Sequence, residues 1–103
     1  MAAKSTILAD KLYQLRASRR IQQKTLASAI GVEPPQYSRM EKGQRSIRLD
    51  QLEIIAKILQ ADLNELHSLW LADKVVDAAS GLPKEVAENA ISIVNDELSN
   101  QEK

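Results

Sequence analysis

The stretch QQKTLASAIGVEPPQYSRME, which runs from Gln22 to Glu41, holds the clearest structural signals in the chain. Leu26 and Ile30 recur at helical spacing, and the pattern stops at Gly31, because glycine readily takes the left-handed conformation that ends a helix. A second helix is expected to begin at Pro34, since proline suits the first helical turn and pushes the preceding residue out of the helical region. The stretch therefore predicts two short helices joined by a turn of about four residues.

The second of these helices has two different sides. Tyr37 and Met40 lie three positions apart on a face that is predicted to turn inward, while Gln36 and Arg39 lie on another. Two helices joined by a short glycine-containing turn, the second presenting polar side chains, form a helix-turn-helix layout. In that layout the second helix enters the major groove of DNA.

The segment LASAIGVEPPQYSRMEKGQRS resembles the helix-turn-helix of the Cro-like phage repressors and the related XRE-type bacterial regulators. In that family a glutamine precedes a Leu-Ala pair, a Gly-Val pair follows, and the recognition helix closes in Glu-x-Gly. The matching positions here are Gln23, Leu26-Ala27, Gly31-Val32 and Glu41-Lys42-Gly43. The resemblance covers roughly residues 6 to 72 and implies an all-α, five-helix, repressor-type DNA-binding domain.

Length and composition limit the remaining architecture. A chain of 103 residues is enough for one small core, so we expect the DNA-binding domain over residues 1–79. An additional amphipathic C-terminal helix is expected over residues 80–103, as a dimerisation or core-packing element. The chain has no cysteine, no signal-peptide pattern and no long apolar run, which favours a cytoplasmic protein that does not enter a membrane.

Charge is distributed unevenly along the chain, although its net value is zero. Through Arg48 the chain carries ten basic and three acidic side chains, and from Leu49 onward four basic and eleven acidic ones. A basic half is drawn to phosphate while an acidic half is repelled, so this asymmetry favours double-stranded DNA as the partner. Two solvated faces of opposite sign are the plainer alternative.

Base reading is expected from the exposed side of the second helix. Arg39 is the first candidate, because arginine makes a bidentate contact to guanine, and Gln36 is the second, because glutamine does the same to adenine. Ser38 is a third candidate. Pro34 and Pro35 stand where well-known relatives have polar base-contacting residues. Either base reading shifts to the three candidates above, or the prolines make apolar contact with thymine methyl groups.

The resemblance also implies residues that contact the DNA backbone and one structural ion pair. In the family, a glutamine at the start of the first helix of the helix-turn-helix binds a phosphate, and a basic loop follows the recognition helix. The phosphate candidates are therefore Gln23, Lys24, Lys42, Arg45 and Arg48. Arg16 and Glu41 match a family pair that ties the helix expected over about residues 6 to 18 to the end of the recognition helix, so both are expected to be structural.

Several apolar residues fall outside the predicted core. Asp50 is expected to cap the next helix, whose Ile54 and Ile58 lie beside its core stripe. Trp70 is either a core residue or an interface anchor, and the C-terminal helix carries Ile93 on its stripe. That helix could fold back on the domain or pair with a second copy. We favour a homodimer that reads a palindrome, which makes these two isoleucines, Trp70 and Ile93 interface candidates.

Catalysis is not expected, and neither is a cofactor or a metal ion. The chain has one histidine, His67, and its carboxylates are scattered over faces that are predicted to be exposed. The main alternative is an antitoxin or adaptor-type interaction module that uses the acidic C-terminal half and binds DNA weakly or without specificity, since a fold does not decide a function.

Overall fold

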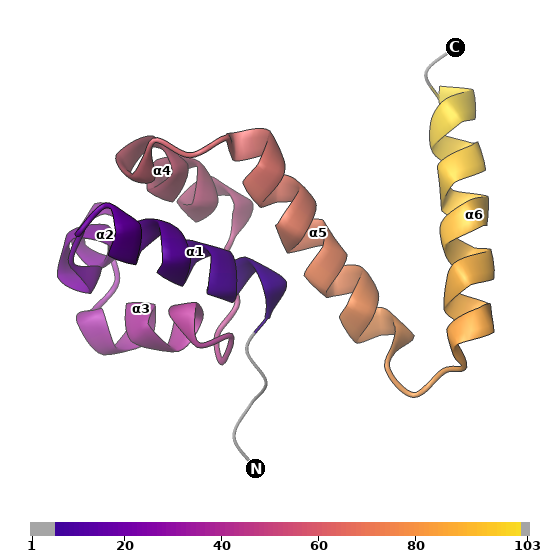
Figure 1. The fold of residues 1–103 in the computed structure, drawn as a ribbon, viewed down its shortest axis with the longest axis horizontal. Coiled ribbons are helices and arrows are strands. Elements are labelled where there is room, and N and C mark those ends of the chain that lie inside the picture. Colours follow the sequence, from indigo (N-terminus) through magenta and orange to yellow (C-terminus); the bar gives the residue numbers. More distant parts are fainter. Residues whose placement is uncertain (1–5, 102–103) are drawn as a thin grey trace. The chain divides into compact units, whose positions relative to one another are not determined.

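The computed structural model describes residues 6–101, and over that range the chain is helical, without strands (Figure 1). The helices are α1 Ile7–Ser18, α2 Gln23–Ala29, α3 Pro34–Glu41, α4 Leu49–Leu59, α5 Leu63–Ala79 and α6 Lys84–Gln101. The all-α prediction, with five helices and an additional C-terminal one, is therefore confirmed. The chain divides into two compact units, one ending at Asp73 and the other beginning at Lys74, and each is described by itself.

The turn between α2 and α3 follows from its residues. Gly31 takes φ +74°, and an added Cβ would meet no atom within 4 Å, so the backbone angle, and not a lack of space, favours glycine here. The Val32 N–H donates to the carbonyl of Ala27 at 3.0 Å and closes the end of α2. Glu33 is extended and Pro34 opens α3, as the sequence predicts.

A single apolar cluster fills the first unit. α2 packs on α3 and α4, and α1 packs on α3, with α5 contributing Leu66 (Figure 1). The buried members are Leu8, Leu12, Leu26, Ala27, Ile30, Tyr37, Met40, Ile47, Leu52, Ile55, Ala56, Leu59 and Leu66. Packing of this kind holds the short helices α2 and α3, which would be marginal on their own.

A side chain from α5 stabilises the start of α1. The Asp73 carboxylate accepts from the N–H groups of Ile7 and Leu8, both at 2.9 Å, and the Thr6 hydroxyl accepts from Ala9 N–H at 3.0 Å. These amides have no partner within the helix, and the positive end of the helix dipole favours a carboxylate. Asp73 thus ties the first helix of the unit to its last.

The start of α4 differs from the sequence prediction. The N-cap is Arg48, not Asp50, and the Arg48 N–H donates to Oε1 of the buried Gln51 at 3.0 Å. Asp50 lies in the first turn of α4 instead, where its charge still suits the helix dipole. The prediction that Asp50 caps this helix was wrong, because the helix begins after Arg48 and Gln51 supplies the capping hydrogen bond.

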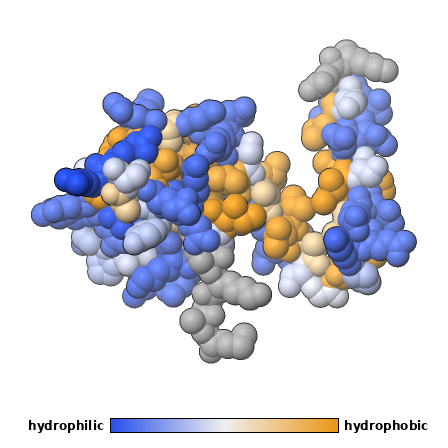
Figure 2. Space-filling view, viewed as in Figure 1, coloured by the Kyte–Doolittle hydropathy of each residue, from blue (hydrophilic) through white to orange (hydrophobic). Residues whose placement is uncertain are grey.

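The second unit contains the end of α5, a turn at Gly81 (φ +85°) and α6. α6 buries none of its residues, and apolar (orange) side chains are exposed along it (Figure 2). The largest exposed ones are Val86, Ile91, Ile93, Val94 and Leu98. The expected domain boundary after residue 79 coincides with the end of α5, whereas the compact units divide within that helix.

Within residues 6–101, the search for membrane-spanning helices found none of sufficient length and apolarity.

Candidate nucleic-acid interface

Helix α3, the candidate recognition helix, is buried on one side and accessible on the other. Tyr37 is fully buried and Met40 is 3% exposed, so the inward face is anchored in the core. Arg39 is exposed, while Ser38 and Gln36 are half-buried. The three candidate base-reading residues therefore belong to a helix whose position is set by packing, which reading a base edge requires.

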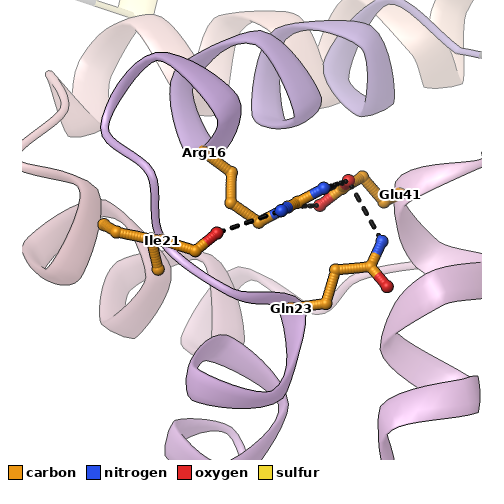
Figure 3. Close-up of polar contacts among 4 residues, drawn as sticks. All are labelled: Arg16, Ile21, Gln23 and Glu41. Atoms are coloured by element: carbon orange, nitrogen blue, oxygen red, sulfur yellow. Dashed lines mark hydrogen bonds and ion pairs between the residues drawn. The ribbon is translucent and has the colours of Figure 1, made fainter.

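A polar cluster fastens the end of α3 to α1 and α2 (Figure 3). Arg16 donates to Glu41 through Nε, at 2.8 and 3.1 Å to the two carboxylate oxygens, and through Nη2 at 2.7 Å. Its Nη1 donates to the carbonyl of Ile21 at 3.0 Å, and Gln23 Nε2 donates to Glu41 at 3.2 Å. The Arg16 side chain is 16% exposed and that of Glu41 is 3% exposed, so this ion pair is shielded from water.

Electrostatics in this cluster favour the charged pair. Burial opposes ionisation of Glu41, but the hydrogen bonds donated by Arg16, and to a smaller extent by Gln23, hold the Glu41 pKa below its ordinary value. The hydrogen bond to Glu41 raises the pKa of Arg16. Burial, followed by the nearby Glu41 charge, raises the pKa of Tyr37 and keeps its phenol neutral. The Tyr37 hydroxyl is buried without a well-formed hydrogen bond.

Gln23 and Lys24 lie at the start of α2. The Gln23 amide is half-buried and tied to Glu41, which the sequence did not indicate. Lys24 is exposed and lines an open groove between α2 and the start of α3, together with Thr25, Ser28, Val32, Glu33 and Pro34. Contact of Gln23 and Lys24 with phosphate stays a prediction.

The loop after α3 carries three exposed cations. Lys42, Arg45 and Arg48 are all accessible, and the Arg48 guanidinium pairs with Asp50 at 3.1 Å. Both side chains of that pair are 70% exposed, and exposed pairs of this kind are weak. Contact of these three cations with phosphate stays a prediction. Arg45 and Arg48 also line a shallow groove with Val32, Met40, Ser46 and Gln51.

Trp70 on α5 contacts the backbone of the loop that follows α3. Its indole Nε1 donates to the carbonyl of Ile47 at 2.8 Å, and its ring packs partly buried against the core. This contact fits the core alternative for Trp70. The sequence could not identify Ile47 as the acceptor, because the two residues are 23 positions apart.

Gln36 has a local role that the sequence analysis missed. Its Oε1 accepts from the N–H of Glu33 at 3.1 Å, which is one half of a capping box at the start of α3. The three-residue spacing of these two residues was the available signal, since a glutamine at the third helical position is typical of this motif.

The interface candidates differ in exposure. Ile54 is 39% exposed and Ile93 is 63% exposed, whereas Ile58 and Trp70 pack partly buried against the core of the first unit. Their roles at a dimer interface stay predictions. Among residues 6–101 no group of three or more His, Cys, Asp or Glu side chains is placed to hold a metal ion.

One comparison with known proteins points to the same segment. A family model described as helix-turn-helix matches residues 12–66, which is more than half of the chain and includes α2, α3 and α4 with parts of α1 and α5. Comparison with curated proteins and with solved structures found no match.

Proposed function

The chain belongs to the Cro-like helix-turn-helix family of DNA-binding regulators, and from that premise we propose that it binds a specific operator as a dimer and represses or controls transcription. Arg39 is the main base reader in this proposal, and Gln36 and Ser38 read beside it. The operator is a palindrome, because two identical domains place two recognition helices about 34 Å apart on one side of the duplex.

The observation that carries the proposal is the anchoring of α3. Tyr37 and Met40 fix the helix from inside and Glu41 fixes its end through Arg16, while Arg39 stays exposed. An exposed arginine on a rigid helix can meet guanine O6 and N7 with both ends of its guanidinium. Such a contact contributes roughly 1 to 3 kcal/mol of discrimination against other bases.

Affinity is proposed to come mainly from cations that contact phosphates. Lys24, at the start of α2, and Lys42, Arg45 and Arg48, in the loop after α3, are exposed on the segments next to the recognition helix. They position the domain without specifying sequence, and each contact makes binding more sensitive to salt. Gln23 would add a phosphate contact only if its amide group donated a hydrogen bond to a phosphate while it also donates to Glu41.

Dimerisation is proposed because one short recognition helix reads few base pairs. Ile54 on α4 and Ile93 on α6 are the exposed candidates for the interface. Ile58 and Trp70 can contribute only their accessible edges, since both pack on their own core.

A protein-interaction module is the second candidate function. It is favoured by α6, where exposed apolar residues lie among the acidic side chains of Glu85, Glu88, Asp96 and Glu97. An antitoxin or adaptor would use such a helix to hold another protein, and DNA binding would then be weak or without specificity.

The test is a fluorescence-anisotropy titration with DNA from upstream of the protein's own gene and with a scrambled duplex, each at two salt concentrations. Wild type is compared with Arg39→Ala and with Arg19→Ala, which removes the same charge from an exposed arginine outside α3. We expect both variants to bind more weakly and only Arg39→Ala to lose its preference for the upstream fragment. Equal weak binding of wild type to both duplexes would reject the specific regulator and favour the interaction module.

A further inference from the structure

The start of α3 offers no free backbone donor to DNA. Pro34 and Pro35 have no N–H, and the N–H groups of Gln36 and Tyr37 both donate to the carbonyl of Glu33, at 2.9 and 3.1 Å. The remaining donor, the Glu33 N–H, is bound by Gln36 Oε1 at 3.1 Å. Every backbone N–H from Glu33 to Tyr37 is therefore either absent or satisfied. Sequence reading at this end of the helix must come from side chains.

The same contacts determine how the Gln36 amide is oriented. Only an oxygen can accept from the Glu33 N–H, so Oε1 lies on the backbone side and Nε2 forms the other end of the amide. A bidentate contact to adenine needs both ends at once, because the oxygen accepts from N6 while the nitrogen donates to N7. An adenine amino group would have to share Oε1, which already accepts from the Glu33 N–H, or draw it away and remove the side-chain cap from a helix of only eight residues.

We propose that Gln36 reads DNA as a hydrogen-bond donor only, through Nε2, and selects a base edge that presents acceptors. In the major groove guanine presents the acceptors N7 and O6 and thymine presents O4, whereas adenine places an amino donor beside its N7 acceptor and cytosine presents an amino donor without an acceptor. The cap thus changes the specificity of a glutamine that would otherwise favour adenine. This inference rests on the proposed DNA-binding function and defines the chemistry of one position in it.

Two variants separate the cap from the donor. Gln36→Glu keeps an acceptor for the Glu33 N–H and loses the donor, and Gln36→Met loses both at similar size. Each is compared with wild type and Arg39→Ala in thermal melting and in binding to duplexes that wild type selects from a random-sequence pool. Every base pair of the selected site is then replaced in turn, so that each protein yields a complete preference profile.

We expect wild type to prefer guanine or thymine at one base pair, with an affinity for these bases up to about tenfold higher than for the others. Gln36→Met should lose this preference and should melt at a lower temperature than wild type. Gln36→Glu should melt like wild type, because a carboxylate also caps, and its preference should move to bases with an amino group.

Two results would overturn the inference alone. One is an adenine preference that disappears in Gln36→Met, and the other is a profile that neither Gln36 variant changes, each with the Arg39-dependent preference intact. If wild type selects no sequence, the proposed function fails and this inference falls with it. Should Gln36→Met fail to fold, the Gln36→Glu profile still decides between donor-only and bidentate reading.

Discussion

Apolar side chains lie in a closed core in the unit that ends at Asp73, whereas those of α6, in the unit that begins at Lys74, are exposed. Both regions show apolar residues at helical spacing in the sequence. The difference lies in what surrounds each stripe, since α1 to α5 supply faces for one another. A periodic pattern therefore predicts a helix and its apolar face, but the partner of that face depends on the rest of the fold.

The two units also differ in the sequence separation of their polar side-chain contacts. In the first unit, side chains join residues far apart in the sequence, as in Arg16 with Glu41 and Asp73 with the start of α1. In the second unit, Ser99 bonds to the carbonyl of Asn95, one helical turn away. Stability of the first unit thus depends on contacts between elements, and four substitutions can test that dependence.

The largest effect is expected from Leu66→Ala on α5. Leu66 is fully buried, so truncation leaves a cavity and should lower the free energy of unfolding by about 2 to 5 kcal/mol. Val76→Ala is the matched control, because Val76 lies on the same helix and is 62% exposed. Urea unfolding at equilibrium measures both. Equal losses would contradict the difference between the two units.

Glu41→Ala should rank second. It leaves the Arg16 guanidinium unpaired in a place with little access to water, which costs roughly 3 kcal/mol. Arg48→Ala removes one partner of an exposed ion pair instead and should leave the unfolding midpoint almost unchanged. A similar loss in both would show that shielding from water does not matter here.

The Glu41 contribution should also depend on pH. Because its folded-state pKa lies below the ordinary value of 4.5, the stabilisation is present above that value and is lost as pH falls through the folded-state pKa. The difference in stability between wild type and Glu41→Ala should therefore narrow from about pH 7 to about pH 3. A constant difference would indicate that the pKa is not lowered.

Asp73→Ala should have a moderate effect. It removes two acceptors from the start of α1, and capping losses of this kind cost about 0.5 to 2 kcal/mol. Asp77→Ala, four residues further along α5 at an exposed position, is the control. Amide hydrogen exchange at Ile7 and Leu8 should accelerate in the first variant and stay unchanged in the second.

The smallest effect on folding is expected from Ile93→Asp on α6. Ile93 is 63% exposed, so unfolding of the first unit should change by less than about 0.5 kcal/mol. If α6 holds the proposed dimer, sedimentation should show dissociation to monomers in this variant. A wild-type dimer that persists in Ile93→Asp would move the interface away from this residue.

Sequence reasoning succeeded where the signal was local. Gly31 lies just after the end of α2, and Pro34 begins α3. Tyr37 and Met40 face inward, as their spacing predicted. It failed at the start of α4, where Asp50 has the better capping chemistry and the backbone instead begins the helix after Arg48.

Long-range contacts were the least predictable. Nothing in the sequence near Asp73 indicates that it caps a helix 65 residues earlier, and Gln23 showed no sign of its bond to Glu41. These contacts require the positions of several helices at once. The Arg16 and Glu41 pair was expected only because relatives suggested it.

The hydrogen bond from Trp70 to Ile47 makes the tryptophan an intrinsic fluorescence probe of the loop after α3. Trp70 is the single tryptophan of the chain, so all indole emission comes from one site. That site contacts the backbone of the loop that carries Arg45 and Arg48, and indole emission responds to changes in hydrogen bonding and hydration. Movement of the loop can therefore be followed by fluorescence without attaching a dye.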